Sequence, residues 1–126
     1  MLKDFNIGVV LAVKDLQKAK EYYGKKLGFE EEPSNDPGGV LYKSGQSKFY
    51  VYQSQFAGTN KATAATWNVD NVKAVVDDLK SRGISFEHYD MPGVELDGDV
   101  HVMKDHGLEA AWFKDPDGNI LNIVKM

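Results

Sequence analysis

Cysteine is absent from this chain of 126 residues. Its absence excludes disulfide bonds, thiolate catalysis and cysteine-based zinc sites. No stretch of the sequence approaches the roughly 18 consecutive apolar residues that a membrane span requires. Residues 1–6 lack the basic start and the apolar run of a secretory signal peptide. The sequence therefore predicts a cytoplasmic protein with no membrane partner.

Basic residues are too few for a nucleic-acid partner. Lys and Arg number 15 against 19 Asp and Glu, which gives a net charge of −4. Phosphate binding requires a concentrated basic face, and the sequence has none. Hydrophobic residues make up 42% of the chain and charged residues 27%, as in an ordinary globular protein. A chain of this length predicts one domain, spanning residues 1–126.

The order of expected elements occurs twice along the chain. Asp15 and Asn71 are suited to cap two helices, and Gly28 and Gly83 are suited to end them. In the first half we expect a strand buried on both faces at 7–13, a helix at 16–26, a strand at 29–32, a loop at 33–39, and a hairpin of 40–43 with 48–53. In the second half we expect a strand at 62–69, a helix at 72–82, a strand at 84–89, a loop at 90–99, a short strand at 100–103, and a hairpin of 109–114 with 119–124.

This repeat predicts an α+β fold of two tandem βαβββ modules. Module one covers about residues 1–54, module two covers about residues 62–126, and residues 55–61 join them. One helix covers only one face of a four-stranded sheet, so neither module is expected to fold alone. We expect the modules to form one curved mixed sheet around a cleft, with the helices on the outer face.

Two phrases of the sequence carry a resemblance to a known family. They are V-K-D-L-Q-K-A-K-E-Y-Y-G-K-K-L-G-F at 13–29 and F-K-D-P-D-G-N-I-L at 113–121. Together with the repeat, they resemble the vicinal oxygen chelate superfamily, which includes glyoxalase I, bleomycin-resistance proteins and extradiol dioxygenases. The resemblance implies the fold over essentially the whole chain.

The resemblance also implies a divalent metal in catalytic members, held by His, Glu or Gln on inward-facing strand positions. Carried over, those positions are Gly8, Ala64, Asn122 and, on the first hairpin, Val51 (or Tyr50 and Tyr52 if the register slips by one residue). Glycine and alanine cannot bind a metal, and a lone asparagine is a weak ligand. We therefore expect no metal and no cofactor. Metal-free members of the superfamily bind and sequester small molecules such as bleomycin-type antibiotics.

The alternation of side chains predicts which residues line the cleft. Trp112 has the opposite parity to Phe113, so it faces the cleft if Phe113 packs on the helices. The expected ligand-binding residues are Trp112, Asn122, Thr66, Asn68, Val10, Ala12 and Tyr52. This lining is small, polar and uncharged, and it suits a neutral or aromatic organic ligand. Tyr22, Tyr23 and Trp67 are expected in the core, and the turn 115–119 is expected to be structural.

The leading hypothesis is a binding protein with no catalytic residues. An alternative is a glyoxalase-like lyase, isomerase or dioxygenase whose non-standard site uses His101, His106 and Glu109. A metal-free enzyme would instead use His88 or His101 with Asp90 or Asp99 as acid and base. An interaction domain with a filled cleft also remains open. We expect a homodimer, because the edges of a long sheet tend to be covered.

Overall fold

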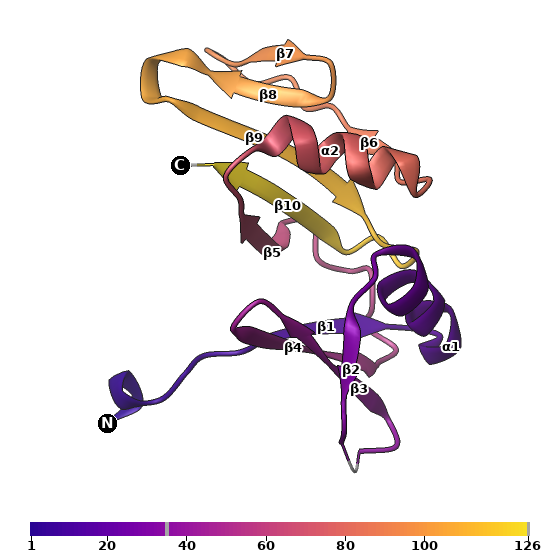
Figure 1. Ribbon diagram of the computed structural model, residues 1–126. Helices are drawn as coiled ribbons and strands as arrows, with labels where there is room; N and C mark the ends of the chain where they lie inside the picture. Colours follow the sequence, from indigo (N-terminus) through magenta and orange to yellow (C-terminus); the bar gives the residue numbers. More distant parts are fainter. Residues whose placement is uncertain (35, 126) are drawn as a thin grey trace. The chain divides into compact units, whose positions relative to one another are not determined.

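The computed structural model describes residues 1–34 and 36–125 (Figure 1). Its chain divides into two compact units, Met1–Thr59 and Asn60–Met126. The predicted α+β order of two tandem βαβββ-like modules is confirmed. The strands hydrogen-bond as two mixed sheets, one in each unit, where the sequence analysis expected one. In the part of the chain that is described, no helix is long and apolar enough to cross a membrane.

The first unit is a four-stranded sheet with one helical segment. Its strands lie in the order β1-β4-β3-β2, with β1 parallel to β4 and the other pairs antiparallel. The elements are η1 (Leu2–Asp4), β1 (Val9–Val13), α1 (Leu16–Ala19), η2 (Lys20–Lys26), β2 (Glu30–Glu32), β3 (Gly39–Ser44) and β4 (Ser47–Gln53). The predicted helix and hairpin are therefore present.

The helix begins at its predicted cap and changes geometry halfway. Oδ1 of Asp15 accepts hydrogen bonds from the backbone N–H groups of Gln17 (3.0 Å) and Lys18 (3.2 Å). From Lys20 onward the segment is π-helical, and the Leu27 N–H donates to the Tyr22 carbonyl at 2.8 Å. The predicted core position of Tyr22 and its neighbour Tyr23 is confirmed, since both are buried.

Strand β1 is buried on one face only, so the prediction of burial on both faces is wrong. Leu11 and Val13 are buried, whereas Val10 is 57% exposed. One helical segment can cover only one face of the sheet, so alternate residues of β1 remain on the other face. The strand begins at Val9, two residues later than predicted, where its pairing with Phe49 of β4 begins.

The second unit is a larger sheet in the order β5-β10-β9-β8-β7, and β6 also pairs with β9. Strand β5 is parallel to β10, and the other pairs are antiparallel. Helix α2 packs against β9 and β10 (Figure 1). The elements are β5 (Thr63–Asn68), α2 (Val72–Ser81), β6 (Phe86–Glu87), β7 (Glu95–Asp97), β8 (Val100–Met103), η3 (Lys104–His106), β9 (Leu108–Lys114) and β10 (Ile120–Lys125).

Two details of the second unit differ from the sequence analysis. Residues 90–99 were predicted to be a loop, but β7 lies within them and pairs antiparallel with β8. All three residues of β7 are exposed, and the segment is only three residues long, so burial and length give little signal for a strand there. Strand β6 contains two residues instead of the predicted six, because only Phe86 and Glu87 pair with β9.

The turn before β10 is structural, as predicted. Asp115 and Asn119 are both buried. Oδ1 of Asp115 accepts from the N–H groups of Asp117 (3.0 Å) and Asn119 (2.9 Å), and Oδ2 accepts from Nδ2 of Asn119 at 2.7 Å. Gly118 has a φ of 88°, which favours glycine. The turn thus fixes where β10 starts and which side chains face each side of the sheet.

Candidate functional site

Three predicted binding residues form one row across the second sheet. Asn122 of β10 pairs with Thr66 of β5 on one side and with Trp112 of β9 on the other. Their neighbours Leu121 and Phe113 are buried against the helix side. The row therefore lies on the sheet face opposite α2, which we call the open face of module two. Asn68, two residues after Thr66, is exposed on the same face.

Asn122 is a buried polar residue that joins three strands. It is 7% exposed. Its Oδ1 accepts a hydrogen bond from Oγ1 of Thr66 at 2.5 Å, and its Nδ2 donates to the backbone carbonyl of Ala111 at 3.1 Å. Because the Thr66 hydroxyl donates to Asn122, its oxygen presents acceptor lone pairs on this face. Asn122 thus orients Thr66, which is the more exposed of the two side chains.

The indole of Trp112 is half-buried and held from two sides. Its Nε1–H donates to Oγ1 of Thr63 at 3.2 Å, so the ring reaches across β10 toward β5. The ring centroids of His101 and Tyr89 lie 4.9 Å and 5.5 Å from it, both nearly perpendicular. No pattern in the sequence indicated a role for Thr63 or Tyr89 beside Trp112. Tyr89 lies beyond the end of β6, where strand parity gives no signal.

One charged pair lies beside Trp112. Glu87 of β6 pairs with Trp112 in register, and its carboxylate lies 3.1 Å from Nζ of Lys114. The open face near Trp112 therefore combines an aromatic ring and a hydroxyl acceptor with a carboxylate that is already paired with a lysine.

The structure resolves the register of the first hairpin. Val51 is fully buried on the helix side, and Tyr50 and Tyr52 lie on the opposite face of β4. Val10 pairs with Tyr50, and Ala12 pairs with Tyr52. Val10, Ala12 and Tyr52 thus share one face, the open face of module one.

The two tyrosine rings on this face are nearly parallel, with centroids 6.2 Å apart and planes at 6°. The Tyr50 hydroxyl donates to a carboxylate oxygen of Asp36. This hydrogen bond lowers the pKa of Asp36 and raises the pKa of Tyr50. Tyr50 is therefore tied to the loop before β3, whereas Tyr52 lies on the same face beside Ala12.

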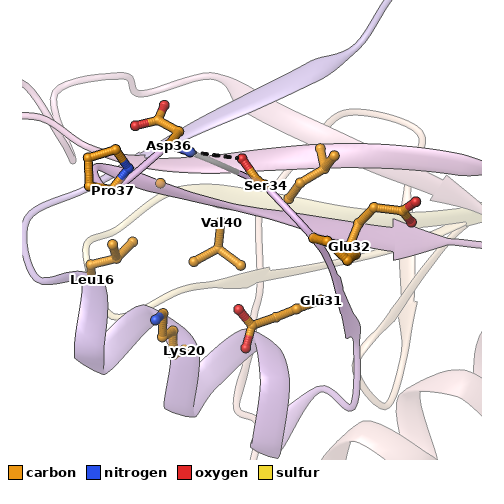
Figure 2. Close-up of a pocket in the computed structure, with 11 residues that line it drawn as sticks. Leu16, Lys20, Glu31, Glu32, Ser34, Asp36, Pro37 and Val40 are labelled. Atoms are coloured by element: carbon orange, nitrogen blue, oxygen red, sulfur yellow. Dashed lines mark hydrogen bonds between the residues drawn. The ribbon is translucent and has the colours of Figure 1, made fainter.

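A depression of about 410 Å³ lies between the helix and the loop before β3 (Figure 2). Lys20, Glu31, Glu32 and Asp36 line it together with Leu16 and Val40, and the Asp36 N–H donates to Oγ of Ser34 at 3.3 Å. Glu32 is already paired with Lys48 at 3.2 Å. These charged walls do not suit a neutral aromatic ligand, and none of the predicted binding residues lies here.

The three histidines do not converge on a metal centre. His106 lies exposed in η3, and Glu109 is half-buried on β9. Across residues 1–34 and 36–125, no group of three or more His, Asp and Glu side chains is placed to hold a metal ion. The predicted non-standard metal site of His101, His106 and Glu109 is therefore wrong in its geometry.

One predicted acid–base pair does form. Nε2 of His88 lies 2.7 Å from Oδ1 of Asp99, and Nζ of Lys80 lies 2.8 Å from Oδ2 of the same carboxylate. The hydrogen bonds from Lys80 and His88 lower the pKa of Asp99, and the bond to Asp99 raises the pKa of Lys80. His88 is half exposed at this pair.

The four positions that the sequence analysis carried over from the superfamily's metal ligands offer few donor atoms. Gly8 has no side chain, Ala64 has a methyl group and Val51 is buried in the core. Asn122 alone has a donor atom, and its amide is engaged with Thr66 and Ala111. A divalent ion requires several oxygen or nitrogen ligands from the protein, and these four residues offer one neutral oxygen.

Comparison with known proteins defines the class. The profile of the Glyoxalase/Bleomycin resistance protein/Dioxygenase superfamily matches residues 7–123. The chain belongs to this superfamily. No curated protein matches the chain in sequence.

Solved structures share the fold at low identity. A glyoxalase family protein from Enterococcus faecalis has a TM-score of 0.73 at 22% identity, over 98% of this chain and 99% of that one. A bleomycin-binding protein complexed with bleomycin has a TM-score of 0.70 at 18% identity, over 97% and 98%. A lactoylglutathione lyase from Agrobacterium tumefaciens has a TM-score of 0.67 at 20% identity, over 96% and 92%. These similarities show the fold alone.

Proposed function

We propose that this protein binds a small, neutral, planar organic molecule on the open face of module two, without a metal or cofactor. The observation that carries the proposal is the placement of Trp112. Its ring is half-buried, anchored by Thr63, and set in one row with Asn122 and Thr66. Aromatic walls with a few fixed polar groups are typical of small-molecule sites.

Each residue of the row has a distinct role in this proposal. Trp112 stacks on the ligand, and stacking contributes about 0.5–1.5 kcal/mol beyond the burial of surface. The Thr66 oxygen accepts a hydrogen bond from the ligand, because its own proton is directed at Asn122. The amide of Asn122 keeps Thr66 in that orientation and adds a polar, uncharged surface. Asn68 supplies a second exposed polar contact on β5.

The open face of module one is proposed as a ligand-binding surface of its own. Val10, Ala12 and Tyr52 form an apolar and aromatic patch on it. The proposal that no metal takes part is supported by the donor chemistry at positions 8, 51, 64 and 122. The bleomycin-binding protein, whose structure contains bleomycin, supports small-molecule binding in this fold.

The test is a titration with a panel of small, neutral, planar aromatic compounds, followed by calorimetry. We expect at least one compound to bind, and Trp112→Ala to weaken it at least about tenfold, equivalent to about 1.4 kcal/mol. Phe56→Ala, which removes an exposed aromatic side chain outside the sheets, is the matched control and should bind like the wild type. Binding that is unchanged in Trp112→Ala would remove this site from consideration.

The metal-free part of the proposal has its own measurement. Purified protein is incubated with Mn, Fe, Co, Ni or Zn ions, desalted, and analysed for bound metal. We expect no stoichiometric retention. Retention of one ion per chain would overturn the metal-free assignment, even if an organic ligand also binds.

A second candidate function is that of a glyoxalase-like lyase or isomerase, and the pair of His88 and Asp99 favours it. A histidine held by a carboxylate at 2.7 Å is a common arrangement for a general base. The hemithioacetal of methylglyoxal and glutathione is the substrate to test, because one structural relative is a lactoylglutathione lyase. Turnover by the wild type that is lost in His88→Gln would favour this candidate. No turnover by the wild type would contradict the lyase or isomerase function, and the binding function would remain.

We also propose a homodimer. Strands β1 and β5 each pair with only one neighbour among the described strands, so each leaves one edge of its sheet open. The segment before β1 exposes Leu2, Phe5 and Ile7, whose burial would favour association. Sedimentation at micromolar concentration should give a species of twice 14.0 kDa. A species of monomer mass alone would contradict the dimer.

A further inference from the structure

His101 is a fully buried histidine beside Trp112. It is 0% exposed and pairs across β8 and β9 with Ala110, two residues from Trp112. Because residues two apart on a strand face the same side, its imidazole lies on the side of Trp112. The ring centroids are 4.9 Å apart, with the planes at 90°.

A hydrogen bond connects the same histidine to Tyr89. The Tyr89 backbone N–H donates to Nε2 of His101 at 2.9 Å. Tyr89 lies two residues beyond the end of β6. Its ring contacts both His101, at 6.1 Å, and Trp112, at 5.5 Å. Since Nε2 accepts, it carries no proton, and the neutral ring has its proton on Nδ1.

We propose that His101 is a positioning residue for ligand binding: its neutral imidazole holds Tyr89 in place, and the two rings together fix the orientation of the Trp112 indole. The inference rests on the proposed function, in which Trp112 stacks on the ligand. His101 itself does not need to touch the ligand. Its protonation would turn Nε2 into a donor and break the bond to the Tyr89 N–H.

The surroundings favour the neutral form. Burial lowers the pKa of His101 and outweighs the backbone hydrogen bonds with Ala110 and Tyr89, which raise it; the nearby His88 adds to the lowering. The other charged groups nearby are already paired: Asp99, before β8, holds His88 and Lys80 of α2, and Glu95 of β7 holds Lys104. On β9, Glu109 faces the opposite side of the sheet from Ala110. The affinity at Trp112 should therefore be constant at and above the ordinary histidine pKa of about 6.5, and should fall only as the pH drops through the lowered pKa of His101.

The test follows the indole N–H resonance of Trp112 in a ¹H–¹⁵N spectrum, with 2-naphthol as the ligand probe. The chain has two tryptophans, so Trp67→Phe identifies the resonance of Trp112. In His101→Gln the side-chain oxygen keeps an acceptor near the position of Nε2, and in His101→Phe the ring remains without an acceptor. His106→Gln, at an exposed histidine, is the matched control.

In the wild type and in His106→Gln, the Trp112 resonance should shift and the affinity for 2-naphthol should fall at least threefold between pH 7.5 and the lowest pH at which circular dichroism shows the protein still folded. His101→Gln should lose this pH dependence, and His101→Phe should bind about tenfold more weakly at both pH values. A resonance that does not change with pH in the wild type, or that changes equally in His101→Gln, would overturn the proposal. If His101→Phe does not fold, the pH dependence of the Trp112 resonance in His101→Gln still tests the proposal.

Failure of the proposed function would look different. If 2-naphthol binds but Trp112→Ala binds it equally well, the ligand does not contact Trp112, and the proposed site is wrong. The pH dependence of the indole resonance needs no ligand, so it tests the link between His101 and Trp112 in either case.

Discussion

The hydrogen bond between Thr66 and Asn122 should couple the stabilities of β5 and β10. The perturbation is the pair of substitutions Thr66→Val and Asn122→Leu, made singly and together. Both keep the approximate volume of the side chain and remove its hydrogen-bonding groups. The bond is 2.5 Å long and lies beside the half-buried Trp112, where Asn122 is 7% exposed.

The magnitude follows from the bonds lost. Asn122→Leu removes the bond to Thr66 and the bond of Nδ2 to the Ala111 carbonyl at 3.1 Å. At about 0.5–1.5 kcal/mol net for each, the free energy of unfolding should fall by roughly 1–3 kcal/mol. Thr66→Val removes only the shared bond and should cost about 0.5–1.5 kcal/mol. The double variant should therefore lose less than the sum, by about the value of that bond.

The assay is urea unfolding of the four proteins, monitored by tryptophan fluorescence and by circular dichroism. The interaction energy of the double-mutant cycle is the measured quantity. Substitutions at independent sites add within about 0.3–0.5 kcal/mol. An interaction energy below that limit would refute the reasoning that Asn122 orients Thr66 through this bond.

Two further predictions concern the helix cap and the carboxylate of the acid–base pair. Asp15→Ala should lower the free energy of unfolding by about 0.5–2 kcal/mol, measured by urea unfolding, because two backbone N–H groups lose their acceptor. The lowered pKa of Asp99 implies stability that is fully present above the unfolded value of about 3.9 and is lost as the pH falls through the folded value. Asp99→Asn should reduce this dependence in urea midpoints measured from pH 6 to pH 3; an unchanged slope would contradict it.

Much of the fold could be predicted because local signals and burial agree. Asp15 and Asn71 cap their helices through their side chains, as expected from sequence. The alternation in β9 and β10 places Phe113 in the core and Trp112 on the other face, because the turn at Asp115 fixes the register. Where a strand has one buried face, the alternation of apolar and polar residues predicts which side chains lie on that face.

Other features had no local signal. The register of the first hairpin depends on which side of β4 the helix covers, and both Val51 and the tyrosines are apolar enough for either face. Strand β7 is exposed and pairs only through its backbone with β8. Tyr89 contacts Trp112 because of the direction that the chain takes after β6 ends. The periodicity of the sequence does not predict that direction. The placement of Thr66, Asn122 and Trp112 in one row was therefore predictable, whereas the groups that hold Trp112 were not.

The central claim is that the open face of module two binds planar organic molecules. The most direct measurement is a ¹H–¹⁵N spectrum of the protein, with assigned resonances, during the addition of a set of neutral planar aromatic fragments. The account predicts that at least one fragment shifts the resonances of Thr66, Asn68 and the Trp112 indole in a saturable way. Fragments that shift only residues elsewhere, or that leave these three unchanged at saturation, would contradict the account.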